Sequence, residues 1–122
     1  TRFDWSDLSI TAQGDDFIAE VSVTNTGARA GSDVVQIYVD DAIPILPRPL
    51  REMKGFAKLH LQPGETKTAR IVLTPRSFAV FDVNNQEWIA RSGTFIIRAA
   101  RNAADFVSIA EVSRDRESRS KP

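Results

Sequence analysis

The chain lacks cysteine altogether and contains a single histidine among its 122 residues. Without cysteine there can be no disulfide framework, no thiolate metal site and no cysteine nucleophile. One histidine likewise excludes metal sites built from several histidines. No apolar run approaches the roughly 20 residues of a membrane span, no signal peptide is recognisable, and the formal net charge is zero with the basic residues scattered. We therefore predict no cofactor, no resident metal, and neither a membrane nor a nucleic acid as partner.

What is present is the composition of an ordinary folded domain, with 42% hydrophobic and 26% charged residues. A chain of this length fits one domain rather than two, and its folding buries roughly two-thirds of the unfolded surface. The chain does not begin with methionine, so we expect it to be part of a longer protein. Cysteine content leaves the compartment open, and we expect a secreted or periplasmic parent in preference to a cytoplasmic one.

Alternation of apolar and polar residues is the dominant pattern, and it predicts β-strands. The segments that alternate most clearly are 17–24, 35–39, 57–61, 69–73 and 95–99. An opening strand is expected across Phe3–Thr11 and a closing one across Asp105–Ser113, with a bulge where 106–109 breaks the alternation. A minor hairpin of 79–82 with 87–90 is also expected. About seven main strands at this spacing predict an immunoglobulin-like or fibronectin type III-like antiparallel β-sandwich.

Proline and glycine mark the turns between these strands. Pro63 and Gly64 occupy the centre of the segment 62–65, which is the pattern of a type II turn because proline presets φ and glycine accepts a positive φ. We expect this turn to join its two flanking strands into a hairpin. Thr74 followed by Pro75 predicts a helical segment of one turn.

Residues that could carry chemistry are few. Trp5-Ser6-Asp7 is not a nucleophile elbow and has no histidine near it, so we interpret Trp5 as an edge-strand residue. The pairs Asp15-Asp16 and Asp40-Asp41 lie at strand ends, and neighbouring side chains on a strand point to opposite faces. We interpret them as turn residues, with a weak surface calcium site as the alternative. His60 falls on the outward face of its strand and has no evident partner. We predict no catalytic residue in this chain.

The segment Ile43–Phe56 is the irregular one, with three prolines among large apolar residues and two arginines. In one interpretation it folds back over the sandwich, and a bulge at Gly55 brings Phe56 inward. In the other it is an apolar and cationic docking surface for another domain, because solvating so many large side chains together would leave a large exposed patch. The residues that we expect in this interface are Ile43, Leu46, Pro47, Arg48, Pro49, Leu50, Arg51, Glu52, Lys54 and Phe56.

Several motifs, taken in order, resemble the fibronectin type III-like domain that closes family 3 glycoside hydrolases such as β-glucosidases. The resemblance runs from about Phe3 to Val112 and implies an immunoglobulin-like β-sandwich. The residues that carry it are Asp33–Asp40, Pro47–Phe56, Leu61–Thr66, Phe81-Asp82, Trp88 and Ser92–Phe95.

The resemblance also implies a role. In that family the nucleophilic aspartate and the acid/base glutamate lie in preceding domains, and neither has a matching motif here. It therefore implies a non-catalytic accessory domain whose partners are the catalytic domains of the same parent chain. The alternative is a module that binds polysaccharide or another plant-wall polymer, or that mediates dimerisation.

The last nine residues differ in composition from the rest. Residues 114–122 contain no apolar side chain apart from the terminal proline, so they bury almost nothing to offset the entropy of ordering. We therefore expect a sandwich domain over residues 1–113 and a disordered polar tail over 114–122.

Overall fold

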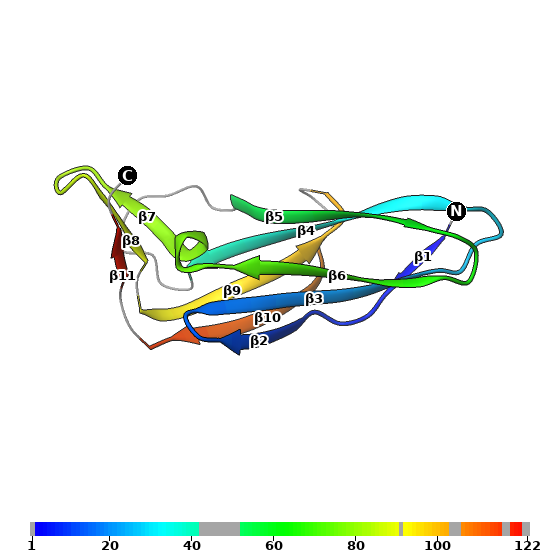
Figure 1. Ribbon diagram of the computed structural model, residues 1–122, viewed down its shortest axis with the longest axis horizontal. Coiled ribbons are helices and arrows are strands. Elements are labelled where there is room, and N and C mark those ends of the chain that lie inside the picture. The colour runs from blue at the N-terminus through cyan, green and yellow to red at the C-terminus, as the bar shows by residue number, and fades with distance from the viewer. Residues whose placement is uncertain (1, 42–51, 91, 103–105, 116–117, 121–122) are drawn as a thin grey trace.

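The computed structural model describes residues 2–41, 52–90, 92–102, 106–115 and 118–120. Two four-stranded antiparallel sheets face each other along the long axis of the molecule (Figure 1). The β3 sheet contains β1 (Phe3–Trp5), β2 (Ser9–Gln13), β3 (Asp16–Asn25) and β6 (Thr66–Leu73). The β4 sheet runs in the order β10 (Phe106–Arg114), β9 (Gly93–Ala100), β4 (Gly31–Asp41) and β5 (Glu52–Leu61). A smaller sheet contains β11 (Ser118–Ser120), β8 (Glu87–Ala90) and β7 (Ala79–Asp82).

The predicted all-β sandwich is confirmed, but the estimate of about seven strands was too low. The described residues form eleven strands, of which β1 and β11 have only three residues each. One added strand comes from the opening segment, which divides into β1 and β2. Ser6 marks the division: its backbone N–H donates to the Ser22 carbonyl at 2.8 Å, while its hydroxyl accepts from the Ser22 N–H at 2.8 Å. The Ser6 hydroxyl thus accepts the hydrogen bond that a backbone carbonyl would accept in a regular ladder.

The core lies between the two large sheets, as the alternation predicts. Inward residues on β4 (Val35, Ile37 and Val39) are fully buried and pack against the inward residues of β3 and β6. Burial of this apolar area is the main favourable term in folding. All of the buried core residues except Phe78 lie on strands of the two sheets, and the full set is Ala19, Val21, Val23, Val35, Ile37, Val39, Leu61, Ala69, Ile71, Leu73, Phe78, Phe95, Ile97, Ala99 and Val112.

The turn at 62–65 forms as predicted, with Gly64 at φ +79° and the Glu65 N–H donating to the Gln62 carbonyl at 3.0 Å. The expected hairpin was wrong. β5 pairs with β4 and β6 pairs with β3, so the turn joins strands of different sheets. The turn therefore carries the chain from one layer of the sandwich to the other, and both strands still direct their apolar row toward the shared core.

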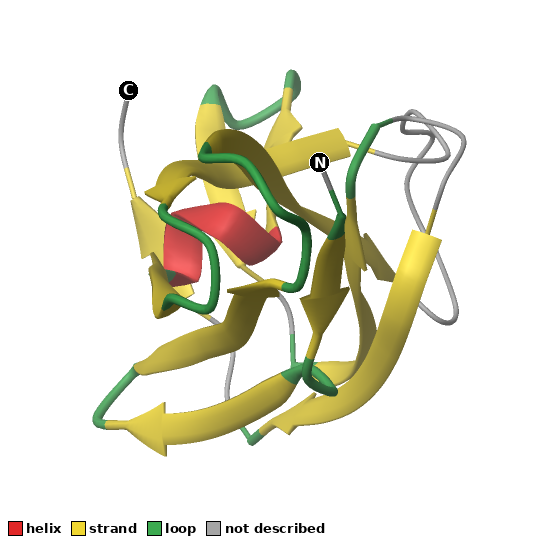
Figure 2. Ribbon diagram, turned by 90° about the vertical axis from the view of Figure 1, so that its right-hand side faces the viewer, coloured by secondary structure: helices red, strands yellow, loops and turns green. Residues whose placement is uncertain are grey.

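The predicted one-turn helix is confirmed as η1 (Pro75–Phe78). Figure 2 shows it surrounded by strands. Its buried Phe78 meets Phe95 of the β4 sheet at 4.9 Å between ring centroids, and Phe17 of the β3 sheet at 5.6 Å, both edge to face. The helix therefore closes the core at one end. The bulge expected in the closing strand is also confirmed, between Phe106 and Ser108.

The C-terminal residues differ in part from the expected disordered tail. Arg114 is the last residue of β10 and is 7% exposed. Ser118–Ser120 pairs with β8 as β11. The physical reason is that ladder pairing uses backbone groups, which a polar segment has as well as an apolar one. How firmly residues beyond Asp115 are held in solution stays a prediction.

Candidate interface on the outer face of the β4 sheet

Strand register aligns side chains in rows across the outer face of the β4 sheet. One row runs from Phe56 on β5 through Gln36 on β4 and Ala100 on β9 to Phe106 on β10. Phe56 is 65% exposed, so it lies on the outer face of the sheet. The alternative, with Phe56 drawn inward by a bulge, was wrong: the register does shift beside Gly55, but Phe56 stays outside.

The next row places Met53, Tyr38, Arg98 and Ile109 side by side. Tyr38 is only 8% exposed although it lies on an outer face. Its ring meets that of Phe106 edge to face at 5.6 Å, and its hydroxyl donates to Gln36 Oε1 at 3.0 Å. An edge-to-face pair with a satisfied hydroxyl holds both rings in one orientation, so the centre of this face is preorganised.

Asp40 forms an ion pair with Arg98 in the middle of the same face. The sequence suggested a turn residue here, which was wrong: Asp40 lies within β4, where its neighbour across the sheet is Ile96. The guanidinium of Arg98 also lies 5.9 Å from the centroid of the Phe106 ring. Asp40 Oδ1 is buried and receives no hydrogen bond, so the pair retains one acceptor without a donor.

The outer face of the β3 sheet is quite different, because hydroxyl groups line it. Ser22 and Thr68 share a hydrogen bond of 2.9 Å between their hydroxyls, and Thr24 and Thr66 share one of 2.7 Å. These four side chains satisfy one another and are accessible to water. Val72, at 44% exposure, is the large apolar side chain exposed on this face among the described residues. The two outer faces thus have contrasting chemistry.

The ten residues that the sequence suggested for an interface fall in two groups. Glu52, Lys54 and Phe56 lie on β5, which is an edge strand of the β4 sheet. The register shift opposite Ile37 and Tyr38 leaves Lys54 as the extra residue of the bulge. The others lie outside the described residues: Ile43, Leu46, Pro47, Arg48, Pro49, Leu50 and Arg51.

Sequence reasoning missed the contribution of β9 and β10 to this face. Ile109 is 61% exposed and Met53 47% exposed, yet neither was a candidate. Alternation does turn Tyr38 and Arg98 outward, so part of the signal was present. The order of the strands could not be predicted from the sequence, because periodicity within a strand does not say which strand lies next to it.

The remaining sequence candidates show no catalytic arrangement among the described residues. Trp5 is on the edge strand β1, as predicted. His60 is exposed, also as predicted, but the expectation that it has no partner was wrong, because its Nδ1 lies 3.1 Å from the Ser32 hydroxyl. Within the described ranges no group of three or more histidine, cysteine, aspartate or glutamate side chains could hold a metal ion. No helix of this part of the chain is long and apolar enough to cross a membrane.

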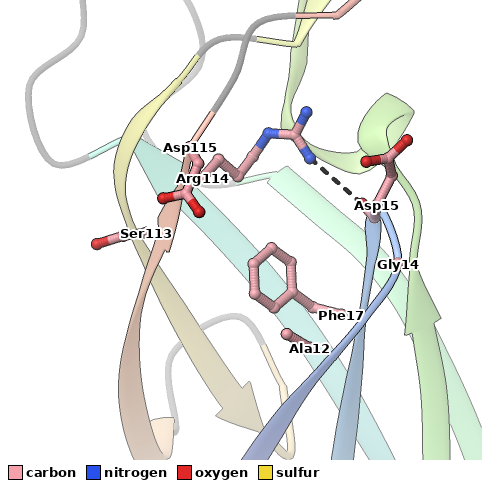
Figure 3. Close-up of a pocket in the computed structure, with 7 residues that line it drawn as sticks. All are labelled: Ala12, Gly14, Asp15, Phe17, Ser113, Arg114 and Asp115. Carbon is pink, nitrogen blue, oxygen red and sulfur yellow. Dashed lines mark hydrogen bonds between the residues drawn. The ribbon is translucent and has the colours of Figure 1, made fainter.

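A cleft of about 290 Å³ lies at one end of the sandwich, between the β2–β3 turn and the end of β10 (Figure 3). Arg114 reaches across it, and its Nη1 donates to the Asp15 carbonyl at 3.5 Å. The guanidinium carbon lies 5.3 Å from the centroid of the Phe78 ring. The arginine therefore links two elements and covers the end of the core, which is a structural role. The lining residues are Ala12, Gly14, Asp15, Phe17, Ser113, Arg114 and Asp115.

Comparison with known proteins agrees with this architecture. The family model described as "Fibronectin type III-like domain" matches residues 33–103, more than half of the chain. The chain belongs to the fibronectin type III-like domain family. This confirms the resemblance drawn from the sequence motifs, because the relatives that match are β-glucosidases.

Two curated relatives illustrate the match. The thermostable β-glucosidase B of Acetivibrio thermocellus is 40% identical over 111 residues, which is 88% of this chain and 15% of that protein. A β-glucosidase of Rhizobium radiobacter is 44% identical over 109 residues, covering 87% of this chain and 13% of that protein. The fibronectin type III-like chain thus spans about one-seventh of the length of these relatives.

Solved structures show the same relationship. A β-glucosidase of Kluyveromyces marxianus, in complex with glucose, superposes with a TM-score of 0.91 at 32% identity and covers 99% of this chain and 15% of that one. β-Glucosidase 3B of Thermotoga neapolitana, also in complex with glucose, superposes with a TM-score of 0.90 at 30% identity. The match covers 100% of this chain and 17% of that one. In these structures too, the similar part is a small fraction of a larger molecule.

Proposed function

We propose that this chain is a non-catalytic accessory domain of a family 3 glycoside hydrolase of the β-glucosidase type. In this proposal it packs against the catalytic domains that hydrolyse β-glycosidic bonds and stabilises them. Glycoside hydrolysis requires two carboxyl groups at a fixed separation on either side of the scissile bond. The contribution of this domain is indirect, because it holds in place the domains that carry that pair.

The observation that carries the proposal is the exposure of Phe56. A phenylalanine that is 65% exposed, with Met53 47% exposed on the same strand, places apolar area in water next to the segment that we predict from the sequence to be an interface. Such area is stabilised when a second surface covers it. Arg48 and Arg51, which lie outside the described residues, would pair with carboxylates on the facing domain.

The alternative function, binding of polysaccharide or a plant-wall polymer, has less support from the side chains. Sugar rings stack on aromatic faces, and among the aromatic side chains that the structure describes only Phe56 is exposed. The Trp5 ring is covered by Arg101 at 5.1 Å and the Trp88 ring by Arg76 at 3.9 Å. A flat row of free aromatic faces is thus not present in the described part of the chain.

A chimera tests the proposal. The matching 111 residues of β-glucosidase B of Acetivibrio thermocellus are replaced by this chain and compared with the same enzyme lacking them. We expect the chimera to hydrolyse an aryl β-glucoside and to resist thermal inactivation, and the shortened enzyme to inactivate faster. The 122-residue chain by itself should show no turnover. Equal inactivation of chimera and shortened enzyme would contradict the stabilising role.

Two point variants refine the test. Phe56→Glu should leave the isolated chain's thermal midpoint unchanged, because the side chain is exposed there, and should speed inactivation of the chimera, because a carboxylate is then buried against the facing domain. Val72→Glu, on the other outer face, is the matched control and should be silent in both. Arg51→Ala should be nearly silent in the isolated chain and destabilising in the chimera. Equal effects in both settings would mean that these residues serve only this domain's own fold.

A further inference from the structure

We propose that the docking surface covers the whole outer face of the β4 sheet, from Phe56 on β5 to Ile109 on β10, and that its occupant is the remainder of the same polypeptide. The inference rests on the proposed function and deepens it, since the sequence suggested only the segment that ends at Phe56. It assigns β9 and β10 to the interface, and it specifies a partner surface that is apolar where it meets Phe56, Met53 and Ile109.

The contrast between the two outer faces indicates that the outer face of the β4 sheet is the docking surface. Among its outward positions the β4 sheet exposes Phe56 and Ile109 at opposite edges and Met53 beside Tyr38, together with the charged Lys58 and Glu111. The outer face of the β3 sheet instead presents hydroxyl pairs such as Ser22 with Thr68, which are satisfied and in contact with water. Scattered exposed apolar residues need no explanation, but apolar residues gathered on one face mark an interaction surface.

The centre of the face is built in advance. Tyr38 is held by the Phe106 ring and by Gln36, and Arg98 is held by Asp40. Groups that are already ordered lose little entropy when a partner covers them. The Asp40–Arg98 pair also neutralises the middle of the face. Asp40 Oδ1 is a buried acceptor without a donor, so the pair lies beneath the accessible surface of this face.

The size of the face indicates a tethered partner in preference to a second free molecule. Four strands about 4.8 Å apart, each with about four outward residues about 6.7 Å apart, present roughly 500 Å². Interfaces between domains of one chain bury about 300–750 Å² on each side, whereas stable complexes of separate proteins need about 800 Å² on each side. Within one polypeptide the effective concentration reaches about the millimolar range, so the smaller area suffices. Relatives about seven times longer than this chain supply such a partner.

The test uses Ile109→Glu in the chimera described above, with Val72→Glu as the matched control. Both replace an exposed β-branched residue on an outer face, at 61% and 44% exposure. The readout is the rate at which a protease cuts the junction between this chain and the catalytic part, with the thermal midpoint of the isolated chain measured beside it. We expect Ile109→Glu to speed cutting about tenfold, because undocking exposes the junction, and to leave the midpoint of the isolated chain unchanged. Val72→Glu should change neither.

Phe56→Glu separates the two proposals. If Phe56→Glu speeds cutting and Ile109→Glu does not, the interface ends near β5 and the extension across the sheet is wrong. If both are silent, docking itself fails and the proposed function fails with it. Two other results would overturn the inference. If the isolated chain self-associates and Ile109→Glu abolishes this, the occupant is a second copy of the chain. If the isolated chain is retained on insoluble glucan and Ile109→Glu abolishes this, the face binds polysaccharide. Should the glutamate destabilise the isolated chain, Ile109→Ser serves in its place.

Discussion

The indole Nε1 of Trp5 donates a 2.8 Å hydrogen bond to Oδ2 of Asp33, and this bond joins β1 of one sheet to β4 of the other. Arg101 completes the cluster from the end of β9. Its Nε lies 3.7 Å from the same carboxylate oxygen, and its Nη2 donates to the Phe3 carbonyl at 2.9 Å. One carboxylate thus holds an edge strand that the backbone attaches to β3 over only three residue pairs.

The Trp5–Asp33 bond should be measurable as a loss of stability. Trp5→Phe keeps an aromatic ring but removes the donor, and we expect it to lower the free energy of unfolding by about 1 kcal/mol. Trp5→Ala also removes the ring that packs against the core and should lower it by roughly 2–3 kcal/mol. Urea denaturation of the isolated chain measures both. Val83→Ala, at a position that is 73% exposed, should be neutral, and a neutral Trp5→Phe would show that the bond contributes nothing.

Asn25 is fully buried and connects two turns through its side chain. Its Nδ2 donates to the carbonyls of Arg29 at 2.8 Å and Leu61 at 3.1 Å, while Oδ1 accepts from the Gly27 N–H at 2.9 Å. Asn25→Asp keeps the acceptor but places a carboxylate against two carbonyl oxygens. We expect a loss of about 2–4 kcal/mol at neutral pH, measured by urea denaturation. The matched control is Asn84→Asp at an exposed position, expected to stay within about 0.5 kcal/mol; equal effects would exclude a special role for Asn25.

Gly55 has no room for a side chain. A β-carbon at this position would lie 2.6 Å from Cγ2 of Ile71, so Gly55→Ala should destabilise the chain by about 1–3 kcal/mol through overpacking. Ile71→Ala removes the opposing methyl group. In the double variant the cost of Gly55→Ala should therefore largely disappear, and a double-mutant cycle of unfolding free energies measures this coupling. If the free-energy losses of the two single variants simply add in the double variant, the cost of Gly55→Ala does not arise from contact with Ile71.

Arg114 should contribute to stability although its type is usually found on the surface. It is 7% exposed, with its guanidinium over the Phe78 ring and a hydrogen bond to the Asp15 carbonyl. We expect Arg114→Ala to cost about 1–2 kcal/mol through lost packing and hydrogen bonding. Arg70→Ala on the exposed face of β6 is the control and should be neutral in the same thermal scan. Equal thermal midpoints for Arg114→Ala and Arg70→Ala would show that Arg114 contributes no more to stability than a solvated surface arginine.

Removal of residues 116–122 is a separate prediction. The strand β11 pairs with β8 over only three residue pairs, and its residues are polar, so little apolar area is lost with it. We expect the truncated chain to unfold within about 1 kcal/mol of the full chain. Calorimetry of both chains decides the matter, and a drop of several degrees would show that this segment packs firmly.

Much of the fold follows from local pattern alone. The alternating segments predict the sandwich and the inward rows, such as Val35, Ile37 and Val39, because the side-chain period of a strand is two residues. Pro63 and Gly64 predict the type II turn for an equally local reason. The division of the opening segment at Ser6 could not be predicted, since it depends on a hydrogen bond to Ser22 in another strand.

By itself, the sequence determined that this protein is a β-sandwich of the fibronectin type III-like family and which side chains of each strand share a face. The tertiary structure alone decided that β5 and β6 lie in different sheets, and that Phe56, Tyr38, Arg98 and Ile109 meet on one surface. The reason is physical. Alternation is a property of a few neighbouring residues, whereas the order of strands in a sheet depends on pairing between segments far apart in the chain, which the periodicity of no single segment specifies.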